Sequence, residues 1–189
     1  KKDLAKANAQ VADLVKSMQG DGYSREHYVE VSSVLIQEQS QAAIDIAESG
    51  LRRYPGARFL YDHVGFAATS LALHQSPSAQ QLVHLQAAEA AFKKALALEP
   101  DTEHTHIGLY QVLDHLDRPD EALGELELAL KFPAAQQQLN FLWLRRAGLL
   151  LRAGKIKDAL AVLQSGEVPA DDLPMQRIMV LRAYALSGD

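Results

Sequence analysis

Residues 87–100 read AAEAAFKKALALEP, and residues 120–133 read DEALGELELALKFP. Each stretch has the apolar spacing of one helix and ends at a proline, which cannot continue a helix. Matching residues of the two stretches lie 34 residues apart: Ala88, Phe92 and Ala95 in the first, Ala122, Leu126 and Ala129 in the second. A period of about 34 residues that spans two helices is typical of stacked helical repeats. The sequence therefore predicts a repeat protein, a class that usually presents a binding surface.

The composition of the 189-residue chain agrees with closely packed helices. Hydrophobic residues make up 48% of the chain and aromatic residues 6%. The net charge of -5 argues against a nucleic-acid partner, which needs a basic surface. Cysteine is absent, so disulfides and thiolate metal sites are excluded. No apolar run approaches the roughly 20 residues of a transmembrane helix, so we expect no membrane span.

Helical periodicity extends over the whole chain, and no alternating strand pattern competes with it. The spacing predicts helices over 1–19, 25–37, 41–53 and 57–74, followed by further helices up to the last residue. In the helix over 25–37 we expect the buried face to consist of Tyr28, Val31, Val34 and Leu35. The sequence therefore predicts an all-α fold.

The recurring residues resemble those of the tetratricopeptide repeat (TPR). Ala88, Phe92, Ala95 and Pro100 match the second helix of that repeat, and Gly65 matches the small residue of its first helix. The resemblance implies an all-α fold, a right-handed α-solenoid of about four TPR-like helix pairs plus flanking helices. The implied segments are an N-terminal helix at 1–20 and an array at 24–189, with repeats at about 24–56, 57–100, 101–134, 139–170 and a partial repeat at 174–189.

Three features depart from a minimal array, and each leaves alternatives open. About eleven extra residues are present, HQSPSAQQLVH (74–84). We expect this segment either to contact a partner as a loop, or to extend the two adjacent helices and place Leu82, Val83 and Leu85 in a local apolar contact. The helix at 1–20 caps the array or is the first helix of a degenerate repeat. The unpaired helix near residue 189 indicates a fragment of a longer array, or a contact with another chain.

The resemblance also implies where a partner would bind, because first helices line the concave face of such arrays. The implied groove residues are Phe59, Asp62, His63, Phe66, His104, Gln111, Asp114, His115, Phe141, Arg145 and Arg152. We expect a non-enzymatic scaffold that binds a peptide or partner segment in this groove. The alternative is a self-association module of a larger protein, in which the partner is a second copy.

Two further patterns bear on function. Residues 101–133 carry a net charge of -6 and residues 134–166 a net charge of +4, which either steers a partner or stabilises adjacent repeats by ion pairs. His63, His104 and His115 could approach one another across the groove, but nothing completes a recognised metal-ligand spacing. No catalytic motif is present. We expect no metal, no cofactor and no enzymatic activity.

Overall fold

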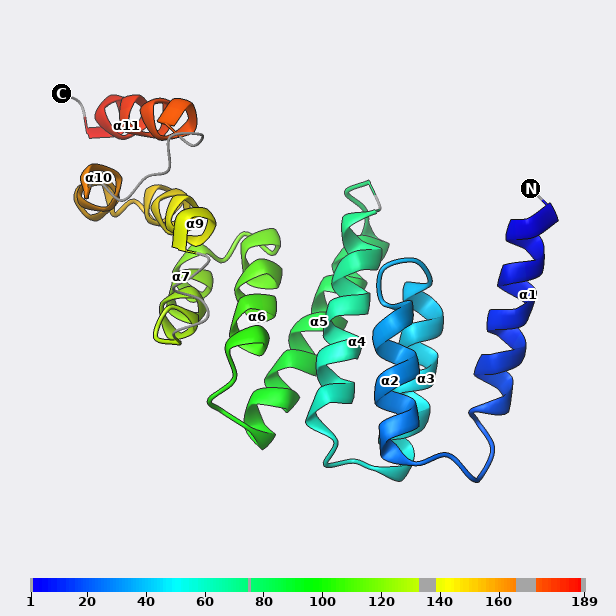
Figure 1. Cartoon of the computed structure of the whole chain (residues 1–189). Coiled ribbons are helices and arrows are strands. Elements are labelled where there is room, and N and C mark those ends of the chain that lie inside the picture. Colours follow the sequence, from blue (N-terminus) through cyan, green and yellow to red (C-terminus); the bar gives the residue numbers. More distant parts are fainter. Residues whose placement is uncertain (1, 75, 133–138, 166–172, 188–189) are drawn as a thin grey trace. The chain divides into compact units, whose positions relative to one another are not determined.

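The computed structural model describes residues 2–74, 76–132, 139–165 and 173–187. The chain divides into two compact units, Lys1–Asp101 and Thr102–Asp189, each of which is built from helices (Figure 1). Within the described residues the regular secondary structure is entirely helical, which confirms the all-α prediction. No helix in this part of the chain is both long enough and apolar enough to cross a membrane.

The first unit contains five helices in the described residues: α1 (Lys2–Ser17), α2 (Arg25–Leu35), α3 (Ser40–Arg53), α4 (Arg58–Leu73) and α5 (Ala79–Leu98). From α2 onward each helix packs against the next, while α1 has a small contact with α3 that includes a hydrogen bond from Gln39 to Asn8. One core cluster consists of Met18, Tyr28, Ile46, Ala47, Ala57 and Leu60. The Tyr28 hydroxyl donates a hydrogen bond to the Met18 carbonyl at 2.8 Å, which ties the segment after α1 to this core.

The start of α2 follows directly from its sequence. The Ser24 hydroxyl accepts a hydrogen bond from the backbone N–H of His27, and the His27 ring accepts one from the backbone N–H of Ser24. This reciprocal cap satisfies two of the backbone donors that a helix start leaves open. The expected buried face of α2 needs one correction, because Val34 is 74% exposed. Tyr28 and Ser32 are the buried residues of α2, and Val31 and Leu35 are half-buried.

The extra residues before Ala88 extend a helix. α5 begins at Ala79 and is 20 residues long, and its Ser78 cap accepts a hydrogen bond from the backbone N–H of Gln81 at 3.2 Å. Leu85 is buried, whereas Leu82 and Val83 are exposed. The structure therefore shows the helix extension, with an apolar contact at Leu85 but not at the other two residues, and the partner contact of this segment stays a prediction.

The second unit contains α6 (Glu103–His115), α7 (Pro119–Ala129), α9 (Leu139–Arg152), α10 (Ile156–Gln164) and α11 (Leu173–Ser187). α6 packs with α7, α9 packs with α7 and α10, and α11 packs against α10 and α9. Fully buried residues at the α6–α7 contact are Leu109, Leu113, Ala122, Leu126 and Ala129. A second cluster joins Trp143 and Ala147 of α9 to Leu163 of α10. The predicted boundaries of the repeats stay a prediction, and residues 133–134 and 166–170 lie outside the described residues.

Candidate functional site

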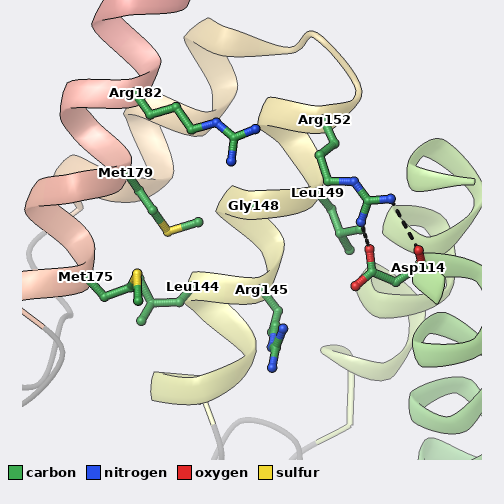
Figure 2. Close-up of a pocket in the computed structure, with 9 residues that line it drawn as sticks. All are labelled: Asp114, Leu144, Arg145, Gly148, Leu149, Arg152, Met175, Met179 and Arg182. Atoms are coloured by element: carbon green, nitrogen blue, oxygen red, sulfur yellow. Dashed lines mark hydrogen bonds and ion pairs between the residues drawn. The ribbon is translucent and has the colours of Figure 1, made fainter. Parts of the chain in front are cut away.

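A groove of about 430 Å³ lies on one face of the second unit, between α6, α9 and α11 (Figure 2). Its lining comprises Asp114, Leu144, Arg145, Gly148, Leu149, Arg152, Met175, Met179 and Arg182. Asp114, Arg145 and Arg152 are among the residues expected to bind a partner, so the structure brings three of them onto one surface.

Helical spacing explains how one face of α9 and one face of α11 meet at this groove. Residues three, four or seven apart on a helix share a face. Arg145, Gly148 and Arg152 have this spacing on α9, and Met175 and Met179 have it on α11. A Cβ atom added at Gly148 would lie 3.2 Å from the methyl carbon of Met179, which is closer than an ordinary contact. Gly148 therefore allows α11 to approach α9.

Arg152 is held at one end of the groove by two acidic residues. Its guanidinium forms an ion pair with Asp114, donates to the Asp114 backbone carbonyl at 3.2 Å, and contacts the Asp117 carboxylate at 2.6 Å. The hydrogen bond to Asp117, partly opposed by desolvation and supported by the charge of Asp114, raises the pKa of Arg152 above its ordinary value. Arg152 is therefore positively charged, and Asp114 and Asp117 of the same unit already pair with this charge.

The opposite net charges of 101–133 and 134–166 meet in further ion pairs within this unit. Lys155 pairs with Asp120 at 2.8 Å, and Arg146 pairs with Glu127 at 3.0 Å. Both ion pairs connect α7 with the two helices that follow it, α9 and α10. The charge pattern thus stabilises neighbouring helix pairs, as one of its two interpretations predicted, with each exposed pair contributing about 0–1 kcal/mol.

The predicted site residues of the first unit all lie on α4. The side chains of Asp62, His63 and Phe66 each contact another side chain of this unit. Asp62 is 4% exposed and pairs with Arg58, and Phe66 packs edge-on against Phe92 with ring centroids 5.0 Å apart. His63 is 2.7 Å from the Ser32 hydroxyl through its Nδ1 atom. Burial, and secondarily the charge of Arg58, lowers the pKa of His63 to about 4.

Phe59 is different from its neighbours because the residue is 54% exposed. The Arg58 guanidinium lies 3.8 Å from the centroid of this ring, and the same arginine pairs with Glu99 at 2.8 Å. Phe59 also borders a second hollow, of about 410 Å³, that is lined by residues of α2 and by the start of α4. This hollow holds both acidic and basic side chains at its edge.

The remaining predicted site residues belong to the second unit, and those of them whose side chains are described do not line the groove. His104 and His115 are exposed on α6, and Gln111 is half-buried on the same helix. Phe141 lies on α9, and its side chain is outside the part of the chain that the structure describes. Among the described residues, no group of three or more histidines or carboxylates is arranged to hold a metal ion.

The groove residues that the sequence prediction missed include three on one helix: Met175, Met179 and Arg182. All three lie on α11, which the sequence indicated as an incomplete repeat. The same 34-residue offset that revealed the array would have found them. It relates Phe141, Arg145 and Gly148 of α9 to these three residues of α11.

Comparison with known proteins supports the fold. The crystal structure of a thermophilic TPR protein from Thermus thermophilus matches 98% of this chain and 92% of that chain, with a TM-score of 0.61 and 17% sequence identity. At that identity the likeness shows the fold alone. Neither a family model nor a curated protein matches the chain. The predicted TPR-like, all-α solenoid class is confirmed.

Proposed function

We propose that this chain is a non-enzymatic protein-interaction scaffold, and that the groove of α6, α9 and α11 binds a segment of a partner protein. The observation that supports this most is the composition of the groove: an apolar floor that includes Leu149 and Met179, with charged side chains at its edge. In protein interfaces, apolar anchors at the centre supply affinity, and charges at the rim supply orientation and partner choice.

A matched pair of variants on α11 tests this proposal. Peptides selected from a random display library against the full chain serve as ligands, and fluorescence anisotropy gives their Kd. Met175→Glu places a charge in the apolar floor, so we expect it to weaken selected peptides at least tenfold. Ile178→Glu is the control, because Ile178 is similarly exposed, 59% against 52%, and does not line the groove.

Two results would contradict groove binding. One is a selection that yields no peptide with saturable binding to the full chain. The other is a set of peptides whose Kd is the same for Met175→Glu and for the unmodified chain. Circular dichroism of each variant checks that the helical content is unchanged.

A second candidate function is self-association through the outer face of α11. Ile178 and Leu181 are large apolar residues that are 59% and 70% exposed there, and exposed apolar patches often mark interaction sites. Light scattering over a range of concentrations would show a dimer in this case, and Leu181→Glu would restore the monomer. A chain that stays monomeric at the highest concentration would contradict this candidate.

A further inference from the structure

Helix α5 is apolar on two opposite sides along its N-terminal half. One side packs against α4 and includes Leu85, Ala88 and Phe92, all of which are buried (Figure 1). The other side, called here the uncharged face, consists of six exposed residues: Ala79, Leu82, Val83, Gln86, Ala87 and Ala90. Their spacing of three or four residues places them on one side of the helix. A helix that is apolar on all sides is normally buried.

The lack of charge on this face is unusual for this chain. Charged residues make up 23% of the chain, yet residues 63–88 contain no Asp, Glu, Lys or Arg. The solvent side of a helix normally carries such residues, whereas the centre of a protein interface is depleted of them. Leu82 and Val83 are 47% and 59% exposed. The uncharged face therefore has the composition of an interface and not that of a solvated surface.

A groove of about 430 Å³ borders the same face and is lined by residues of α3, α4 and α5. Its apolar lining includes Leu51, Val64, Ala87 and Ala90, and its charged lining consists of Glu48, Arg52 and Lys94. Val83 lies four residues before Ala87 on the same side of α5, outside this lining. One helix thus carries large exposed residues and, about two turns further on, small residues beside a groove.

A second copy of this chain fits the uncharged face because the face is complementary to itself. Two α5 helices that meet around a twofold axis run antiparallel, so each contact occurs twice. With the axis near Gln86, Leu82 of one copy lies opposite Ala90 of the other, and a large residue meets a small one. A charged surface that faced its own copy would bring like charges together, but the uncharged face does not.

We propose that this chain forms a symmetric dimer in which the uncharged face of α5 packs antiparallel against the same face of a second copy. Leu82 and Val83 of each copy contact the groove of the other, and Gln86 meets its own copy at the axis. The extra residues before Ala88 thereby gain a partner, because the helix extension carries both large residues. This contact is separate from the groove of α6, α9 and α11 and from the outer face of α11.

Measurements of mass in solution locate the contact. Analytical ultracentrifugation of the full chain should show a dimer of twice the monomer mass of 20.7 kDa. Val83→Glu places a charge in the apolar contact, so it should weaken the dimer at least tenfold. Leu181→Glu is the matched control, because Leu181 of the second unit is also apolar and exposed, 70% against 59%. Its dimer Kd should stay within twofold of that of the unmodified chain, and circular dichroism checks the helical content of both variants.

Gln86 supplies a test that only a contact between two copies of this face would pass. Gln86→Glu and Gln86→Lys each place two like charges at the axis, so each variant alone should dimerise at least tenfold more weakly than the unmodified chain. An equal mixture brings glutamate of one copy against lysine of the other. The mixture should therefore dimerise at least tenfold more tightly than either variant alone. This recovery should weaken as salt rises, because ions screen exposed charges.

Three results would overturn the inference. The first is a chain that remains a monomer at the highest concentration reached. The second is a dimer that Leu181→Glu dissociates and Val83→Glu leaves intact, which would place the contact on α11. The third is a mixture of the two Gln86 variants that dimerises no better than either alone. Peptide binding by the groove of α6, α9 and α11 is measured separately, through Met175→Glu, so the failure of one proposal is distinguishable from the failure of the other.

Discussion

At the level of single residues, His63 shows how burial fixes a protonation state. The Ser32 hydroxyl donates to the Tyr28 carbonyl at 2.6 Å, so its oxygen is left to accept from the Nδ1–H of His63 at 2.7 Å. Burial and the nearby charge of Arg58 then lower the pKa of His63 from 6.5 to about 4. The imidazole is neutral in the folded chain at physiological pH and serves as a structural hydrogen-bonding group.

This pKa predicts a pH dependence of stability. Between pH 6.5 and 4 the unfolded chain binds a proton at His63 that the folded chain does not bind. The contribution of His63 is therefore complete above pH 6.5 and is lost as the pH falls through 4. After a discount for partial exposure, we expect a loss of about 2 kcal/mol in the free energy of unfolding. Urea titrations followed by circular dichroism at pH 7 and pH 4 measure it.

The His63→Gln variant isolates this effect from the titration of carboxylates. Its free energy of unfolding should fall by less than that of the unmodified chain over the same pH interval. An equal fall in both proteins would show that His63 titrates normally.

Asp117 is a second residue with an unusual conformation. It has a positive φ of 58° in the turn between α6 and α7, where glycine is usual, and Gly154 has φ 72° after α9. Its carboxylate, 89% exposed, also contacts Arg152. The left-handed backbone conformation costs most residues with a Cβ atom about 1–2 kcal/mol and costs aspartate less, because its short polar side chain can hydrogen-bond locally, whereas an exposed ion pair contributes about 0–1 kcal/mol.

The backbone cost therefore predicts an order among substitutions at residue 117. Asp117→Gly should change the free energy of unfolding by less than about 1 kcal/mol, because relief of strain offsets the lost ion pair. Asp117→Ala should lose about 1–2 kcal/mol, because alanine tolerates positive φ poorly and loses the same pair. Fluorescence of Trp143, the single tryptophan of the chain, follows unfolding of this unit. Equal losses in both variants would mean that the ion pair dominates.

At the level of elements, the α4–α5 contact depends on a small residue facing a large one. A Cβ atom at Gly65 would lie 2.6 Å from the Cε1 and Cζ atoms of the buried Phe92 ring. This distance is too short for any carbon–carbon contact, so either the ring or the helix would have to move. Gly65 therefore sets how closely α4 and α5 approach each other.

Gly65→Ala should destabilise the chain by about 1–2 kcal/mol. Alanine favours a helix over glycine by up to about 1 kcal/mol, but overpacking a filled core typically costs about 1–3 kcal/mol. Gly124→Ala in α7 is the control, because nothing apart from the nearby backbone of its own helix lies within 4 Å of the added Cβ position. It should stabilise the chain by about 0.5–1 kcal/mol. Urea unfolding followed by circular dichroism compares the two, and a stabilising Gly65→Ala would refute this account of the interface.

Elements were predictable from the sequence where local chemistry is strong. Ser24 and Ser78 are residues of the kind that cap helix starts, and their side chains cap α2 and α5. Val34 was assigned wrongly to a buried face because periodicity alone does not tell which flank of an apolar stripe meets a neighbouring helix. Likewise, apolar periodicity could not reveal that Leu85 is buried while Leu82 and Val83 are exposed.

At the level of the whole molecule, the candidate site belongs to one unit. Asp114, Arg145 and Arg152 could be found from the sequence because the resemblance to TPR specifies which positions of a first helix face inward. The contribution of α11 was missed because its residues were treated as the end of an incomplete repeat. Asp62 and His63 were also predicted to face the groove, from the first helix of another repeat. Their contacts with Arg58 and Ser32 arise from packing that no repeat pattern encodes.

The methionines allow one measurement to test the central claim, the proposal that the groove of α6, α9 and α11 binds a segment of a partner protein. The chain has three methionines: Met175 and Met179 line the groove, and Met18 is buried in the core of the first unit. The experiment is an NMR titration of the 13C-methyl-labelled full chain with a peptide selected against that chain from the display library. We predict saturable shifts of the Met175 and Met179 methyl signals and an unchanged Met18 signal. Binding that leaves both groove signals in place, or that shifts all three alike, would contradict the account.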